Sequence, residues 1–93
     1  GLVAMLFANT PGAIAPWSGS KPVFGTNPIA FAAPLAGREP VVIDMALSKV
    51  ARGPIVAAKQ KGLAIPEGWA LDVHGKPTTD AEAALAGTMV PLG

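Results

Sequence analysis

The stretch of residues 41–48 constrains the fold most strongly. It opens as an apolar run over 41–43, ends in the carboxylate of Asp44, and leads within a few residues into a segment with helical spacing. A short apolar run of this kind predicts a buried strand over 41–44. The point where a strand end faces a helix start is a common ligand site, because the first N–H groups of a helix are unpaired.

Two interpretations of Asp44 and Ser48 stay open at this point. Either side chain could cap the helix that follows, since both residue types are favoured caps. Alternatively, either could face a polar ligand. A carboxylate beside such an apolar run is expected to have a hydrogen-bonding or charged neighbour, because burying it alone is costly.

The best helix candidate covers about residues 47–61, and Gly62 suits the position after its last turn. Pro54 lies inside this range. In a helix interior, proline removes one hydrogen bond and costs roughly 3 kcal/mol. We expect a single helix that kinks at Pro54, and the alternative is a turn followed by a helix that begins with Pro54. Four residues would form its apolar face: Val50, Ala51, Ile55 and Ala58.

Two earlier apolar runs predict strands over 2–8 and 29–33, the first of them buried. The second could pair with 41–44 as a hairpin across the polar turn at 36–40. With the helix, these strands predict a mixed α/β (α+β) fold in a single unit over 1–93. No internal repeat or domain boundary interrupts the sequence.

Residues 11–28 form a long connection with four prolines and three glycines. Three apolar side chains within it, Trp17, Val23 and Phe24, are expected to pack it in place. Near the other end of the chain, a short helix is expected over 81–86, with Asp80 among its possible N-caps.

The amino-acid composition restricts the possible partners and cellular location of the chain. Of its 93 residues, 51% are apolar and only 14% are charged, which is little polar surface for a free-standing domain of this size. We therefore expect either burial in an oligomer or, as the apolar first residues favour, an internal piece of a longer protein. A net charge of +1 from scattered basic residues predicts no nucleic-acid or membrane partner. The chain has no cysteine, which fits a cytoplasmic protein.

Spacing alone reveals no catalytic constellation. His74, the single histidine, lies in a Gly/Pro turn, and no His, Asp and Glu cluster has the spacing of metal ligands. Neither standard glycine-rich nucleotide motif occurs. Two polar positions remain as candidates for binding a ligand, namely Thr10 after the first strand and the segment from Asp44 to Ser48. Thr10 could equally be a turn residue that bonds its own backbone.

Several distinctive blocks follow one another along the whole chain. They are Asn9-Thr10-Pro11, Ala15-Pro16-Trp17-Ser18-Gly19, Phe24-Gly25-Thr26-Asn27-Pro28-Ile29-Ala30, Val42-Ile43-Asp44-Met45-Ala46, and the runs 65–72, 75–80 and 86–93. Together they resemble the malate/L-lactate dehydrogenase family, which does not use a Rossmann fold. Ser18 and Pro54 depart from the family pattern, where glycine and a residue such as lysine are more usual.

The resemblance implies a longer homodimeric enzyme, with this chain as the central, cofactor-binding part. Such enzymes transfer hydride between NAD or NADP and a small 2-oxo acid, 2-hydroxy acid or cyclic imino acid. The segment matching Asp44, Met45 and Ala46 lines the cofactor site in the family, and the position matching Thr10 contributes to it.

The same resemblance gives Asp44 a catalytic role, since its carboxylate would help to orient a catalytic histidine. Ser48 could reach the same cofactor. The family's histidine belongs to an upstream segment, so His74 does not inherit its role and the 93 residues alone are expected to be inactive. The rival hypothesis is a non-catalytic small domain that serves homo-oligomer assembly.

Overall fold

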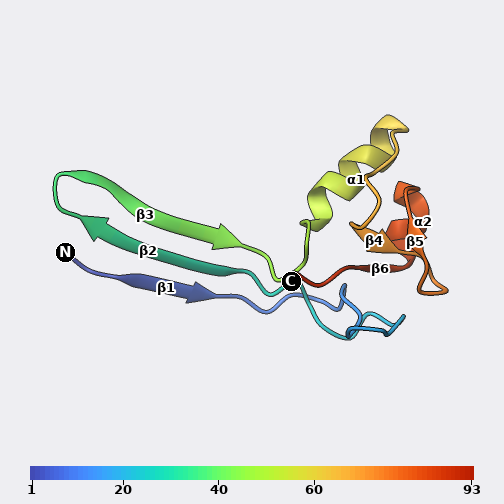
Figure 1. The fold of residues 1–93 in the computed structure, drawn as a ribbon, viewed down its shortest axis with the longest axis horizontal. Coiled ribbons are helices and arrows are strands. Elements are labelled where there is room, and N and C mark those ends of the chain that lie inside the picture. Colours follow the sequence, from blue (N-terminus) through green and yellow to red (C-terminus); the bar gives the residue numbers. More distant parts are fainter.

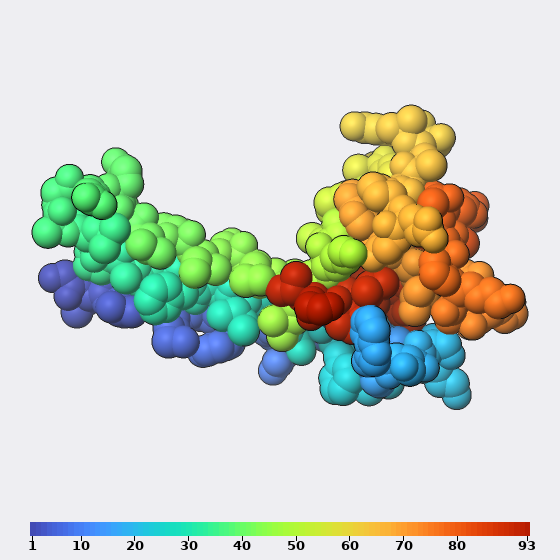
Figure 2. Space-filling model, viewed as in Figure 1, coloured from blue at the N-terminus to red at the C-terminus, as the bar shows by residue number.

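A computed structural model describes all of residues 1–93. The molecule is elongated, with principal extents of 49 × 27 × 20 Å. Three strands project from one side, and two helices with three two-residue strands form a compact unit at the other side (Figure 1). We call these two parts the arm and the body. Figure 2 shows the arm standing clear of the body along most of its length. No helix has the length and apolar character needed to cross a membrane.

The arm consists of β1 (Ala4–Phe7), β2 (Ile29–Leu35) and β3 (Arg38–Met45), in the antiparallel order β1-β2-β3. The predicted hairpin is confirmed, with Gly37 in the left-handed region at φ 66° in its turn. β3 begins three residues earlier than predicted, despite Pro40. Proline is tolerated there because β3 is an edge strand, and the register irregularity between Ala33 and Leu35 accommodates Pro34 in β2.

The predicted burial of β1 and β3 is wrong for this chain. Every residue of β1 and β3 is exposed, including Phe7 at 69% and Val42 at 65%. Apolar side chains therefore lie on both faces of the sheet. The reason is that neither helix packs over the arm, as Figure 1 makes plain.

The body contains α1 (Arg52–Lys61), β4 (Ala70–Leu71), β5 (Pro77–Thr78), α2 (Ala81–Ala86) and β6 (Thr88–Met89). Its short strands pair in the order β5-β4-β6. The hydrophobic core of the molecule lies between the two helices and this small sheet. Its members are Ile14, Ile55, Ile65, Ala70, Ala81, Ala84 and Met89.

The prediction of one kinked helix over 47–61 is wrong at its start. α1 begins at Arg52, after an N-cap at Ala51 that makes no side-chain hydrogen bond. Pro54 is thus the third residue of α1, where its missing N–H would have no intrahelical acceptor in any case, so no kink is needed. This outcome is close to the alternative of a turn followed by a helix. The predicted end is confirmed, because Gly62 has φ 66° and its N–H bonds to the carbonyls of the last turn.

Neither Asp44 nor Ser48 caps α1. Asp44 belongs to β3, and Ser48 forms an isolated bridge with Pro91. Asp80, by contrast, is the N-cap of α2, and its side chain accepts a hydrogen bond from the N–H of Glu82.

The long connection over 11–28 is ordered, but not by the residues expected. Trp17, Val23 and Phe24 are 76%, 63% and 54% exposed. The loop is held instead by its backbone, where Ile14 and Phe24 exchange N–H···O bonds of 2.8 and 3.0 Å. The buried side chain of Ile14 joins the core, which fixes the loop against the body.

Candidate functional site

The two candidate segments meet where the arm joins the body. Leu47, in the segment after β3, donates its N–H to the carbonyl of Thr26 at 2.7 Å. Its own carbonyl accepts the N–H of Leu92 at 2.8 Å. The residues just before β2, the residues just after β3 and the last residues of the chain are therefore tied together at one place.

Thr10 lies at this junction and is bonded to residues far from it in sequence. Its N–H donates to Asn27 Oδ1 at 3.0 Å, and its Oγ1 accepts the N–H of Thr26 at 2.8 Å and that of Asn27 at 3.4 Å. The two threonine hydroxyl oxygens are 3.2 Å apart. Thr10 is thus more than a local turn residue, since it holds the turn that precedes β2.

The direction of the hydroxyl–hydroxyl bond follows from counting donors and acceptors. A threonine hydroxyl has one proton and two acceptor lone pairs. Thr10 Oγ1 already accepts two backbone N–H groups, so its proton is the one shared with Thr26 Oγ1. The proton of the Thr26 hydroxyl is then free to be donated to a ligand. Of these two hydroxyls, the one on Thr26 is therefore the one that can donate to a ligand, and the hydrogen bond from Thr10 holds the Thr26 hydroxyl in place.

Gly25 allows this close approach. It is buried, and a Cβ added to it would lie 2.2 Å from the Thr10 carbonyl oxygen and 2.5 Å from both Thr10 Oγ1 and Asn27 Oδ1. Asn27 itself takes a positive φ of 33°, a conformation that asparagine tolerates better than most residues. The turn over 25–27 is therefore specified by side-chain size and by backbone conformation together.

Asp44 is placed differently from the sequence expectation. It is exposed, it lies opposite Ala30 in the β2–β3 pair, and none of the side-chain hydrogen bonds of the chain involves it. The expected partner is therefore not supplied by these 93 residues. Because paired residues of an antiparallel sheet point to the same face, Asp44 shares a face with Ala30 and Leu6.

The other three candidate residues follow Asp44 along the chain. Met45 ends β3 opposite Ile29, and Ala46 is half-buried. Ser48 is buried, and its Oγ donates to the Val50 carbonyl at 2.6 Å, so the hydroxyl proton is already used. Through the bond from Leu47 to Thr26, this segment is attached to the Thr10 turn.

A pocket of about 330 Å³ opens beside the Thr10 turn. Thr10 and Thr26 line it on one side, and Arg52 at the start of α1 is its one charged lining residue. Thr26 and Arg52 were not among the residues predicted from the sequence. Thr26 is identified by its hydrogen bond to Thr10, 16 residues away, and Arg52 by the pocket that it lines with them, and both relations exist only in the folded chain.

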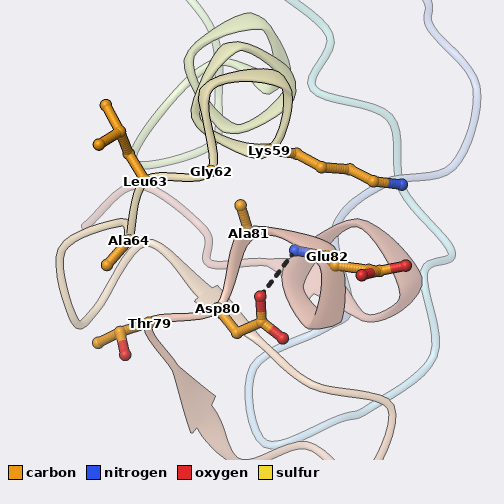
Figure 3. A pocket seen from close by; sticks show the side chains of 8 residues that line it. All are labelled: Lys59, Gly62, Leu63, Ala64, Thr79, Asp80, Ala81 and Glu82. Carbon is orange, nitrogen blue, oxygen red and sulfur yellow. Dashed lines mark hydrogen bonds between the residues drawn. The ribbon is translucent and has the colours of Figure 1, made fainter.

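A larger pocket of about 430 Å³ lies at the far side of the body, between the end of α1 and the start of α2 (Figure 3). None of the predicted site residues lines it. As Figure 3 shows, the carboxylate of Asp80 is turned onto the Glu82 N–H, which uses it as a helix cap. Charged side chains of both signs, Lys59 and Glu82, also line this pocket, unlike the pocket beside Thr10, where the one charged residue is a cation.

Other chemistry-bearing side chains lie apart from the junction. His74 is exposed in the turn between β4 and β5, where its N–H bonds to Asp72 Oδ1. The N–H groups of Lys76 and His74 hold the pKa of Asp72 below its ordinary value. No group of three or more His, Asp or Glu side chains is placed to hold a metal ion.

Comparison with known proteins identifies the family. The family model for malate/L-lactate dehydrogenase matches residues 1–93. The (2R)-3-sulfolactate dehydrogenase (NADP(+)) of Chromohalobacter salexigens is 63% identical over the whole chain. Two solved structures, each matched over 98% of this chain at 41% identity, superpose with TM-scores of 0.92 and 0.91. They are a dehydrogenase from Sinorhizobium meliloti and the delta1-piperideine-2-carboxylate reductase from Pseudomonas syringae pv. tomato.

The chain corresponds to only part of each of these relatives. The chain spans 28% of the sulfolactate dehydrogenase and 26% and 28% of the two solved chains. All of the arm and body elements, including the turn at Thr10 and the segment from Asp44 to Ser48, lie within the matched residues. The chain belongs to the malate/L-lactate dehydrogenase family.

Proposed function

We propose that the protein containing this chain is an oxidoreductase that transfers hydride between NADH or NADPH and a small 2-oxo acid or cyclic imino acid. Two relatives support this substrate class, one named a sulfolactate dehydrogenase that uses NADP(+) and the other a piperideine-2-carboxylate reductase. Sulfolactate is a 2-hydroxy acid, and piperideine-2-carboxylate is a cyclic imine with a carboxylate on the imine carbon. Both reactions therefore change the oxidation state of the carbon next to a carboxylate.

The donor set at the junction fits a nicotinamide dinucleotide. The observation that carries the proposal is the free proton of the Thr26 hydroxyl beside a pocket that holds a guanidinium and no carboxylate. Phosphate and ribose oxygens accept hydrogen bonds from groups of this kind. When bound, the cofactor supplies or takes up the hydride. The residues of this chain bind and orient it.

Within this proposal, Thr10, Asp44, Met45, Ala46 and Ser48 form part of the cofactor site. Asp44 also orients a catalytic histidine that lies outside these 93 residues. The chain is then the central cofactor-binding region of a longer enzyme. The proposal includes a cytoplasmic location and a homodimer, and the exposed apolar faces of the arm support an assembly that covers them.

The test is nicotinamide oxidation by the complete protein, offered pyruvate, oxaloacetate, sulfopyruvate and a cyclic imino acid with NADH and with NADPH. Turnover with any pair establishes the class and names substrate and cofactor together. A folded protein that neither turns over any pair nor binds either nucleotide would refute the proposal. That result would favour the rival, a non-catalytic assembly domain, for which the exposed apolar arm is the supporting observation.

The role of Asp44 is tested by Asp44→Asn in the complete protein. Loss of the charge is expected to lower kcat/KM at least about tenfold, or about 1.4 kcal/mol of transition-state stabilisation. Glu39→Gln is the matched control, because Glu39 is another exposed acid on β3 and is not a site residue. Equal kcat/KM for the two variants would remove Asp44 from the mechanism.

A further inference from the structure

We propose that Arg52 binds a phosphate group of the nicotinamide dinucleotide, and this inference rests on the function proposed above. Arg52 lines the pocket of about 330 Å³ together with Thr10, Thr26 and residues 11–13. This volume is at the lower end of small-molecule sites, which run roughly from 300 to 1,000 Å³. It suits a phosphate with its neighbouring sugar rather than a whole dinucleotide.

The charge around the pocket is unbalanced. Arg52 is the one charged residue of its lining, and no carboxylate lines it. A guanidinium without an internal carboxylate partner is free to pair with an anion from outside the chain. Arginine suits phosphate in particular, because its planar fork of N–H donors matches two phosphate oxygens at once.

The backbone beside Arg52 adds donors to the same place. α1 has no side-chain cap at Ala51 and no acidic residue in its first turn. The N–H groups of Arg52 and Gly53 therefore have no intrahelical acceptor, while Pro54 has no N–H to satisfy. A Cβ at Gly53 would meet no atom within 4 Å, so the first turn of α1 is uncovered beside Gly53.

Thr26 completes the set of donors. It lines the same pocket, and its bond to Thr10 leaves its hydroxyl proton free. A cationic residue and a hydroxyl donor in one lining that has no carboxylate form a site for an oxyanion. The pocket thus has the donor chemistry for one of the phosphates of the cofactor.

The same chemistry could meet two different phosphates, namely the pyrophosphate common to NADH and NADPH or the 2′-phosphate of NADPH alone. Fluorescence titration of the complete protein with each nucleotide, in the absence of substrate, distinguishes them. Arg52→Gln is expected to raise the Kd about 10- to 100-fold, the range given by losing one charged hydrogen-bonded contact. An equal rise for both nucleotides assigns Arg52 to the pyrophosphate, and a rise for NADPH alone assigns it to the 2′-phosphate.

Two further variants sharpen the test. Arg52→Lys keeps the charge but not the fork, so it is expected to recover part of the affinity. Lys59→Ala is the matched control, because Lys59 is another exposed cation of α1 that does not line this pocket. Arg52 is exposed, so melting temperatures of all variants are expected to match the unmodified protein.

The outcomes separate this inference from the function on which it rests. If the unmodified protein binds neither nucleotide, the proposed function fails. If it binds them and Arg52→Gln binds both with unchanged Kd, the function stands and the phosphate contact is refuted. A rise in Kd that Lys59→Ala reproduces would also refute it, because the effect would then come from overall charge.

Discussion

Substitution of Gly25 by alanine probes the turn that joins the two halves of the candidate site. The new Cβ would lie 2.2 Å from the Thr10 carbonyl oxygen and 2.5 Å from Thr10 Oγ1 and Asn27 Oδ1. The carbonyl oxygen is part of the backbone and cannot rotate away. The turn over 25–27 must therefore move off Thr10, and the hydrogen bonds between them lengthen or break.

The expected loss of stability has two parts. Forcing an extra methyl group into a packed site costs roughly 1–3 kcal/mol. The bonds from Thr10 N to Asn27 Oδ1 and from Thr26 N to Thr10 Oγ1, at 3.0 and 2.8 Å, are the two best placed to be lost. Each contributes about 1 kcal/mol. The two losses are not fully additive, because the movement of the turn that breaks the bonds also relieves the clash. We therefore expect the free energy of unfolding to fall by about 2–4 kcal/mol in total.

Gly53→Ala is the matched control for this substitution. A Cβ at Gly53 meets no atom within 4 Å, and its φ lies outside the left-handed region. Alanine has the higher helix propensity, so this variant is expected to be neutral or more stable by up to about 1 kcal/mol.

Urea unfolding of the complete protein and both variants measures the difference, and nucleotide titration shows whether the displaced Thr26 also weakens binding. If the two variants unfold within about 0.5 kcal/mol of each other, the close packing of Gly25 against Thr10 is refuted.

Two further predictions concern the body. Ile55→Ala is expected to lower the free energy of unfolding, measured with urea, by about 2–5 kcal/mol, because the Ile55 side chain is 0% exposed in the core. Val56→Ala is the control and should lower it clearly less, because Val56 is half-buried. Equal losses would contradict the assigned core. The N–H groups of Lys76 and His74 lower the pKa of Asp72 in the folded state. The ionised Asp72 carboxylate therefore stabilises the fold at neutral pH, and this stabilisation is lost as the pH falls through the lowered pKa. Asp72→Asn should therefore flatten the acid side of the melting-temperature profile, and parallel profiles for variant and unmodified protein would contradict this.

Local features of the sequence predicted much of the secondary structure. The hairpin of β2 and β3 follows from two apolar runs around a polar turn with Gly37. α2 was predicted with its observed bounds, because Asp80 and Gly87 mark its two ends. In both cases the interactions that determine the element join residues close together in the sequence, so a short sequence pattern is enough to predict it.

The predictions are wrong or incomplete where contacts between residues far apart in the sequence determine the structure. α1 begins at Arg52 because Leu47 and Lys49, on either side of Ser48, are hydrogen-bonded to Leu92 and Val90, which removes 47–51 from the helix. Apolar runs predict burial only when another layer covers them, and the arm has none within this chain. The contact of Thr10 with Thr26 depends on closing the long loop between them, which no local pattern specifies.

The two parts of the candidate site therefore differ in what fixes them. The Thr10 turn is closed by bonds within the chain, and Gly25 makes room for them, so its geometry is built by these residues alone. Asp44 has no hydrogen-bond partner among the same residues and lies on an uncovered strand. A carboxylate orients another group only when its own direction is fixed. The proposed catalytic role of Asp44 thus requires a partner from outside the 93 residues, whereas the proposed binding role of Thr26 does not.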